Sequence, residues 1–175
     1  MDFKLLKSEQ IYIGWIFNVR RDTLLTPAAK QVDMEIVEHA NAVTIIPFDK
    51  QGRVWFVRQY RHAGGQEILE LPAGKLEAGE QPEVCAHREI REEIGMKAGS
   101  LEKVGTFYLA PGYSTEFMHV FLATDLQPDP LPGDEDEFLT VETYPVDQVF
   151  RLIDSAQLLD AKTLAALMLV RNRLG

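Results

Sequence analysis

The sequence contains almost no cysteine: Cys85 is the single one in 175 residues. One thiol cannot form an internal disulfide bond or a cysteine-based zinc cluster, so both are excluded as sources of stability. The composition fits a reducing compartment, and we expect the protein to be cytoplasmic.

Long apolar runs are lacking as well. No stretch reaches the roughly 18 apolar residues that a membrane-spanning helix needs. Residues Met1 to Lys4 do not begin an apolar segment with a small-residue cleavage site, as a secretory signal peptide would. We therefore expect a soluble protein without a membrane partner.

Positive charge is scarce relative to negative charge. Lys and Arg together number 18 and Asp and Glu 27, so the formal net charge is -9 and the pI is about 4.9. Nucleic acids are held through their phosphates by clustered Lys and Arg, so this balance argues against nucleic acid as a partner. An anionic substrate would have to be bound by positive charge gathered locally.

The apolar content of the sequence, 46% hydrophobic residues, is sufficient for one globular domain with a sizeable core. Alternating apolar side chains predict antiparallel strands over residues 11–20 and 33–38. Arg21-Asp22 and Thr26-Pro27 are turn-prone pairs beside these strands.

The rest of the chain shows strand and helix signals in mixed order. Strands are predicted over residues 42–47, 54–60, 68–71, 104–109, 118–124 and 138–144. Helices are predicted over residues 82–94, 146–153 and 161–173, with Gly95 as the stop of the first and Asp160 as the cap of the last. This order predicts an α/β sandwich with a largely mixed sheet, and the acidic, proline-rich stretch 127–137 is expected to be a loop.

The segment between Gly74 and Met96 carries the strongest chemical signal. Gly74 is followed after five residues by Glu80, and after seven more by the run Arg88-Glu89-Ile90-Arg91-Glu92-Glu93-Ile94-Gly95-Met96. In a helix Glu89 and Glu93 stack one turn apart, and Glu92 lies beside them. Like charges at this spacing cost a helix roughly 0.2–0.5 kcal/mol per pair, so we expect a neutralising partner.

A hard divalent cation is the partner that fits this helical edge best. Carboxylate oxygens, without His or Cys at metal-binding spacing, favour Mg²⁺, with Mn²⁺ as the alternative, over zinc. Taken without the rest of the pattern, the three carboxylates would instead indicate an exposed acidic helix in an acidic protein. Cys85 and His87 lie just before the run, and we expect them to be packing or surface residues.

The spacing resembles the Nudix box at each of its nine fixed positions over 23 residues. The resemblance implies a Nudix-type α/β/α sandwich with a mixed sheet over residues 41–175. Residues 1–40 would form an additional N-terminal antiparallel β segment.

The resemblance to the Nudix box also implies roles for individual residues. Metal ligands would be the Ala73 carbonyl, Glu89 and Glu93, and Glu92 would ligate directly or support catalysis. Arg88 would orient these carboxylates through ion pairs, a role that suits its planar group. Gly74, next to Ala73, would give its turn conformational freedom.

Residues outside the box narrow the resemblance. Pro111 lies 16 positions after Gly95, and the segments 57–61 and 70–74 are similar to those of ADP-ribose pyrophosphatases. The resemblance implies Mg²⁺-dependent hydrolysis of a nucleoside diphosphate sugar, with ADP-ribose cleaved to AMP and ribose 5-phosphate. A hydrolase of GDP-mannose or of several nucleotide sugars is the alternative, and a nucleotide-sugar sensor without turnover is a more distant one.

The same subfamily resemblance assigns substrate-binding residues. Arg61 would hold the diphosphate bidentately, with a surface arginine as the alternative interpretation. Glu116 would contact a ribose, and Glu70 would ligate the metal or support its ligands. Trp15 would stack on the base, with packing in the core as the alternative.

The resemblance further implies a general base from the acidic loop and a partner subunit. Glu137 and Glu135 are the candidates for the base, because a carboxylate needs only modest tuning of its pKa to accept a proton from water. Residues 1–40 resemble the extra strands through which such enzymes form homodimers. A domain-swapped dimer is one form that these strands allow.

Overall fold

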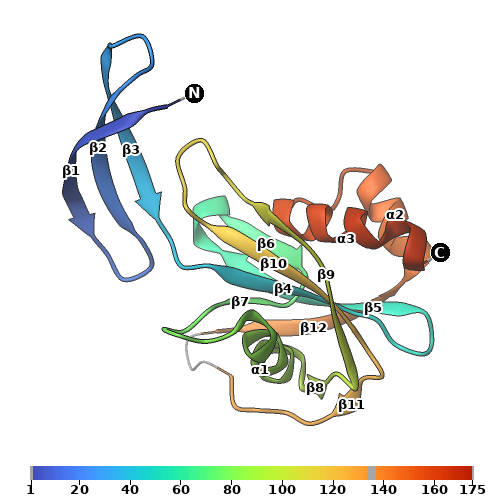
Figure 1. Cartoon of the computed structure of the whole chain (residues 1–175). Coiled ribbons are helices and arrows are strands. Elements are labelled where there is room, and N and C mark those ends of the chain that lie inside the picture. The colour runs from blue at the N-terminus through green and yellow to red at the C-terminus, as the bar shows by residue number, and fades with distance from the viewer. Residues whose placement is uncertain (1, 134–136, 175) are drawn as a thin grey trace. The chain divides into compact units, whose positions relative to one another are not determined.

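The computed structural model describes residues 2–133 and 137–174. The chain forms two compact units, which we call the N-terminal unit and the main unit (Figure 1). They comprise Met1–Asn41 with Tyr108–Phe117, and Ala42–Phe107 with Met118–Gly175. Residues 108–117 thus join the N-terminal unit from the middle of the sequence, which no sequence pattern indicated.

The N-terminal unit is built on a three-stranded antiparallel sheet in the order β1-β2-β3. Its strands are β1 (Lys4–Ile13), β2 (Asn18–Leu25) and β3 (Gln31–Glu38). The predicted N-terminal antiparallel β structure is therefore confirmed.

The prediction of one strand over residues 11–20 was wrong, because the chain turns back between β1 and β2. The Gly14 N–H donates to the Asn18 side chain at 3.2 Å across this turn. Arg21 and Asp22, which were expected in a turn, lie inside β2. Apolar alternation continues through this part of the sequence, so the turn was not predicted, although glycine and asparagine are typical turn residues.

Main-chain hydrogen bonds attach residues 108–117 to the end of β3. The Val37 N–H donates to the Tyr113 carbonyl at 2.7 Å, and the Thr115 N–H donates to the Val37 carbonyl at 3.0 Å. The Thr115 hydroxyl accepts from the His39 N–H at 3.0 Å and donates to the His39 carbonyl at 3.1 Å. The turn that contains Tyr113 is thereby held against β3.

The main unit contains two larger sheets. A mixed four-stranded sheet has the order β7-β4-β10-β9, with β4 parallel to β10 and antiparallel to β7. A three-stranded antiparallel sheet has the order β12-β5-β6, and β8 pairs with β11. The strands are β4 (Ala42–Pro47), β5 (Arg53–Arg61), β6 (Gln66–Glu70), β7 (Ala73–Lys75), β8 (Met96–Lys97), β9 (Ser100–Tyr108), β10 (Phe117–Thr124), β11 (Gln127–Pro128) and β12 (Leu139–Pro145).

The described residues form three α-helices, α1 (Pro82–Ile94), α2 (Val146–Asp154) and α3 (Ala161–Leu174), and a 3-10 turn at His62–Gly64. Helix α1 packs against β4, β5 and β7, whereas α3 packs against β4 and α2 against β5 and β12. Figure 1 shows α1 on one side of the sheets and the α2–α3 pair on the other. The predicted α/β sandwich with a mixed sheet is confirmed. Among the helices described, none is long and apolar enough to cross a membrane.

One side of α1 is buried against the sheets. Ala86, Ile90 and Ile94 form an apolar stripe along the helix and lie in this core with Cys85 beside them. Gly95 ends the helix with a φ of 69°, in the left-handed region that glycine adopts without strain. Burial of this side fixes the direction in which the carboxylate-bearing edge of α1 faces.

Candidate active site

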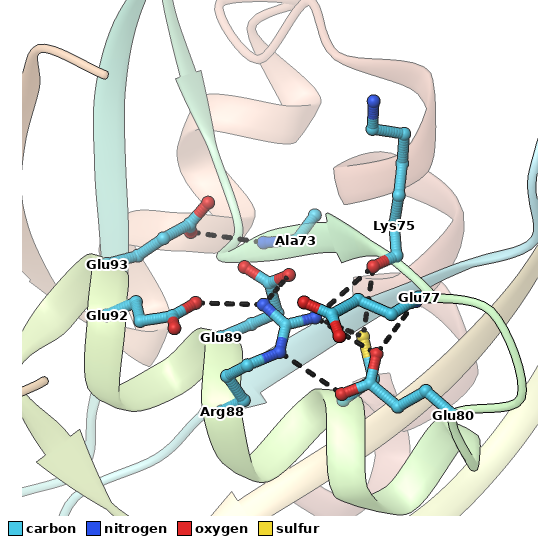
Figure 2. A network of polar contacts seen from close by, with 9 residues as sticks. Ala73, Lys75, Glu77, Glu80, Arg88, Glu89, Glu92 and Glu93 are labelled. Carbon is cyan, nitrogen blue, oxygen red and sulfur yellow. Dashed lines mark hydrogen bonds and ion pairs between the residues drawn. The ribbon is translucent and has the colours of Figure 1, made fainter. Parts of the chain in front are cut away.

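Arg88 lies at the centre of a polar network on α1 (Figure 2). Its guanidinium donates to Glu89 at 2.7 Å, to Glu92 at 2.9 Å and to both oxygens of Glu80 at 3.1 Å. A planar group with several donors can pair with three carboxylates at once, which an ammonium group does less well. The structure therefore contains the ion pairs that the resemblance implied for Arg88.

The turn before α1 holds Glu80 in place. The Glu77 N–H donates to the Glu80 carboxylate at 2.9 Å, and the Glu80 N–H donates to the Glu77 carbonyl at 3.0 Å. Hydrogen bonds from Arg88 lower the pKa of Glu80 below its usual range. Arg88 also donates to the Lys75 carbonyl at 3.3 Å, while Figure 2 shows the Lys75 ammonium group pointing away from the cluster. One guanidinium thus joins the loop to the helix.

Gly74 lies inside β7, where a side chain would overlap the carboxylate of Glu89. The expectation that Gly74 supplies turn freedom was wrong, because positive φ angles occur at Gly79 and Gly95 but not at Gly74. Glycine is needed at this position because the strand and the carboxylate approach each other closely.

Glu93 points toward the start of β7 (Figure 2). The Ala73 N–H donates to the Glu93 carboxylate at 3.1 Å. Ala73 is itself held in register opposite Thr44 of β4, and the preceding Pro72 carbonyl accepts from the Ile45 N–H at 2.8 Å. The backbone beside Glu93 is therefore fixed to the sheet, while a metal contact of the Ala73 carbonyl stays a prediction.

The carboxylates of α1 carry more negative charge than their neighbours balance. Burial raises the pKa of Glu89 to about 7 against the attraction of Arg88, and repulsion from Glu92 and Glu137 adds to this effect. Burial and the charges of Glu89 and Glu137 raise the pKa of Glu93 well above its usual range. Glu137, just before β12, is thus electrostatically coupled to two predicted metal ligands.

The ligand atoms at this edge are oxygens, the type that Mg²⁺ and Mn²⁺ prefer. Within the part of the chain that the structure describes, no three Asp, Glu, His or Cys side chains are gathered as a metal-binding group. Arg88 donates hydrogen bonds to carboxylate oxygens of Glu89 and Glu92, and the Ala73 N–H donates to a carboxylate oxygen of Glu93. A cation shared by these carboxylates would therefore require them to turn from their present donors.

A second charged cluster lies at the end of β6. Arg61 donates to both oxygens of Glu70 at 2.7 Å, and Lys162 of α3 contacts the same carboxylate and that of Asp160, the latter at 2.9 Å. Burial raises the pKa of Glu70, but Arg61 and Lys162 outweigh it, and the net shift is downward. Burial raises the pKa of Glu93, and the charge of Lys162 offsets a small part of this rise, so the two clusters are coupled.

The sequence identified Arg61 and Glu70 but missed Lys162. Asp160 was expected only as a helix cap, and it does accept from the Thr163 N–H at 3.0 Å. Lys162 lies 92 residues after Glu70, and no local pattern links the two positions. One signal was available, because a lysine in the first turn of a helix opposes the helix dipole and therefore suggests a carboxylate partner.

The N-terminal unit holds the two other predicted substrate-binding residues. Trp15 lies between β1 and β2 and is 97% exposed, so the alternative in which it packs in the core was wrong. The Glu116 carboxylate lies 3.8 Å from Nδ1 of His39. Of the two candidate bases, Glu135 lies outside the described residues and Glu137 within them.

Comparison with known proteins gives the chain relatives over nearly its whole length. ADP-ribose pyrophosphatase from Bacillus subtilis (strain 168) is 37% identical over 169 residues, which cover 95% of this chain and 91% of that protein. ADP-ribose pyrophosphatase from Mycobacterium tuberculosis is 37% identical over 172 residues, 97% of this chain and 83% of that protein. GDP-mannose pyrophosphatase from Escherichia coli O1:K1 is 34% identical over 143 residues, 76% of this chain and 74% of that protein.

A solved structure is similar over the same length. The crystal structure of an ADP compounds hydrolase matches this fold with a TM-score of 0.90 at 26% sequence identity, covering 99% of this chain and 95% of that one. The family model of the NUDIX domain matches residues 38–167, which include both charged clusters. The chain therefore belongs to the NUDIX domain family.

Proposed function

We propose that this chain hydrolyses the pyrophosphate bond of nucleoside diphosphate sugars and prefers ADP-ribose, giving AMP and ribose 5-phosphate. The observation that carries the proposal is the edge of α1, where Glu89 and Glu92 gather around Arg88 and Glu93 lies alongside. The two relatives named ADP-ribose pyrophosphatase and the ADP compounds hydrolase support this choice of substrate.

We assign a divalent cation, Mg²⁺ with Mn²⁺ as the alternative, to Glu89 and Glu93, with Glu92 and the Ala73 carbonyl as further ligands. The raised pKa values of Glu89 and Glu93 support this assignment, because positive charge between the two would favour their ionised forms. When bound, the cation supplies neutralising charge for the diphosphate and acidifies water.

The chain's own residues orient the carboxylates and accept a proton. In the reaction, water adds to one phosphorus through a new P–O bond while the bridging P–O bond breaks, so each product carries a phosphate monoester. We assign Glu137 as the group that accepts the proton of the water, with Glu135 as the alternative. The influence of Glu137 on the pKa values of Glu89 and Glu93 supports its presence near these carboxylates.

Substrate binding is assigned to Arg61, Glu116 and Trp15. Arg61 donates its Nε–H and one Nη2–H to Glu70, and its Nη1 hydrogens are the proposed donors to the diphosphate oxygens. Because Lys162 also pairs with Glu70, the Arg61 guanidinium is the proposed donor for an anionic substrate in this acidic protein. The exposed ring of Trp15 is the proposed stacking surface for the base, and Glu116 the proposed ribose contact.

Two alternatives remain for the activity. Hydrolysis of GDP-mannose or of several nucleotide sugars is supported by the relative named GDP-mannose pyrophosphatase. A nucleotide-sugar sensor without turnover is less well supported, because Arg88 and the three carboxylates Glu89, Glu92 and Glu93 are all present.

Turnover of a substrate panel tests the proposal. With Mg²⁺ and ADP-ribose, GDP-mannose or UDP-glucose, we expect the fastest cleavage for ADP-ribose, with AMP measured by chromatography. Glu93→Gln should lower kcat by at least about 10²-fold, since it removes a proposed metal ligand. Glu83→Gln, an exposed carboxylate on the same helix, is the matched control and should keep wild-type kcat.

Each result of the panel has a definite meaning. Comparable rates on several sugars would replace the ADP-ribose preference by a broad specificity. Wild-type turnover by Glu93→Gln would overturn the assignment of the site. Binding of nucleotide sugars without any cleavage would favour the sensor.

We also propose that a second copy of this chain binds the N-terminal unit. Every residue of β1 is exposed. The exposed large apolar side chains of residues 3–17, which include β1 and the turn after it, are Phe3, Leu5, Leu6, Ile11, Tyr12, Ile13, Trp15, Ile16 and Phe17. Apolar surface gathered in this way is uncommon on monomeric proteins and typical of interaction sites. The resemblance to enzymes that form homodimers through N-terminal strands supports a second copy as the partner.

A further inference from the structure

Lys162 is a largely buried cation, with its side chain 12% exposed, and the proposed reaction gives it no step. Its ammonium group contacts the Glu70 carboxylate and lies 2.9 Å from that of Asp160. Glu70 in turn binds Arg61 through both of its oxygens. These contacts form a continuous chain from Asp160 through Lys162 and Glu70 to Arg61.

Arg61 is the exposed end of this chain of ion pairs. Its side chain is 45% exposed, whereas that of Glu70 is 3% exposed. A free arginine side chain samples many rotamers, and two parallel hydrogen bonds to one carboxylate restrict it to a single direction. That restriction depends on a carboxylate that does not itself move, and Lys162 is the second charge that holds Glu70.

The first turn of α3 also fixes the backbone at the end of β6. The Thr163 hydroxyl accepts from the Leu71 N–H at 2.8 Å and donates to Asp160 at 2.6 Å. Leu71 lies two residues before Ala73, whose N–H donates to Glu93. The turn that carries Lys162 therefore contacts the segment that leads to the carboxylates of α1.

We propose that Lys162 is a positioning residue for the hydrolysis: it clamps Glu70 and thereby keeps the Arg61 guanidinium directed at the substrate diphosphate. This inference rests on the proposed function, since it takes Arg61 as the diphosphate contact. Lys162 itself needs no contact with the substrate, because its ammonium group is already engaged by Glu70 and Asp160.

A purely structural role of Lys162 predicts a different result from a positioning role. Without Lys162, Glu70 keeps Arg61 as its partner, and Asp160 keeps the hydrogen bonds from the Thr163 N–H and hydroxyl, so the fold is expected to survive. A structural role would lower stability without a specific effect on substrate affinity. A positioning role raises KM, and the rise depends on the presence of Arg61.

The first experiment compares Lys162→Met with wild type, using ADP-ribose and Mg²⁺. We expect KM to rise about tenfold with kcat changed by less than about twofold, the pattern of lost substrate binding. Arg173→Met is the matched control, because Arg173 lies on the same helix in an exposed ion pair with Glu102. It should leave both constants unchanged.

A double-mutant cycle with Arg61→Met tests whether Lys162 acts through Arg61. In the Arg61→Met background, Lys162→Met should change KM by less than about twofold, since the two residues form one unit. An independent tenfold rise in that background, or an unchanged KM in Lys162→Met alone, overturns the proposal. If Lys162→Met does not fold, Lys162→Arg keeps the charge with altered geometry and should give an intermediate KM.

Calorimetric binding of ADP separates this inference from the proposed function. If wild type cleaves no sugar of the panel, the proposed function fails, and the affinity for ADP then tests positioning alone. About tenfold weaker ADP binding by Lys162→Met would support the inference, because the diphosphate loses a directed guanidinium. Equal ADP affinities of Lys162→Met and wild type would overturn it.

Discussion

A methyl group added at Gly74 would occupy the place of the Glu89 carboxylate. In Gly74→Ala this carboxylate must move, and with it the contact to Arg88. We expect kcat for ADP-ribose to fall about 10²-fold, as for other small displacements of catalytic groups. Overpacking should lower the free energy of unfolding by about 1–3 kcal/mol, measured by urea denaturation.

Gly64→Ala is the control for this substitution. A methyl group at Gly64 would lie 3.5 Å from the Ile68 side chain, an ordinary contact distance. We expect kcat and stability close to wild type. Wild-type kcat in Gly74→Ala would show that the present position of Glu89 is not needed for catalysis.

Gly74 also shows how far single residues can be predicted from the sequence. The spacing of the box identifies the glycine, the arginine and the carboxylates, because each occupies a fixed position relative to the others. The reason for Gly74 was nevertheless mistaken, since the approach of β7 to Glu89 is a tertiary contact. Lys162 was missed for the same reason, because its partner Glu70 lies in a distant strand.

At the scale of elements, burial on α1 raises the pKa values of two carboxyl groups. It raises the pKa of Glu89 to about 7 and that of Glu93 well above its usual range. The folded protein then binds protons that the unfolded chain, with a usual value of 4.5, has released. Between pH 4.5 and 7 the free energy of unfolding should fall as pH rises, by up to about 1.4 kcal/mol per pH unit for each group. Urea denaturation in the presence of a chelator measures this slope.

Comparison with Glu89→Gln isolates the contribution of one group. The variant lacks one titration, so its slope should be shallower and its stability relative to wild type should increase as pH rises. The measurement does not extend below pH 4.5, because Glu70 begins to titrate there. Burial raises the pKa of Glu70, but Arg61 and Lys162 outweigh burial and lower it. Mg²⁺ should flatten the wild-type dependence of the free energy of unfolding on pH. Parallel curves of unfolding free energy against pH for wild type and Glu89→Gln would contradict a raised pKa of Glu89.

The bounds of the three helices were predicted to within one residue, whereas several strands were not predicted. Helix α1 has an apolar stripe of Ala86, Ile90 and Ile94 and a glycine stop, and Asp160 caps α3, so local signals define both. Strands β7, β8 and β11 span two or three residues, too few to show alternation. The parallel pairing of β4 with β10 joins segments far apart in the chain and has no local signal.

At the scale of the whole molecule, the exposed apolar surface of the N-terminal unit predicts a homodimer. Ile13 is 77% exposed at the end of β1, and a glutamate there would place charge in the proposed interface. We expect wild type to sediment as a dimer and Ile13→Glu to sediment as a monomer in analytical ultracentrifugation. Met168→Glu, at an exposed apolar position of the main unit, is the control and should leave the dimer intact.

The monomeric variant would also test whether the N-terminal unit takes part in substrate binding. If Trp15 stacks on the base only within the dimer, Ile13→Glu should raise KM for ADP-ribose by about tenfold, the effect of losing one aromatic contact of roughly 1–1.5 kcal/mol. The main unit carries the carboxylates of α1, so kcat should change little. A monomer with wild-type KM would restrict the N-terminal unit to dimer formation and remove Trp15 from the substrate site. A variant that stays dimeric would show that the apolar surface around Ile13 is not the interface.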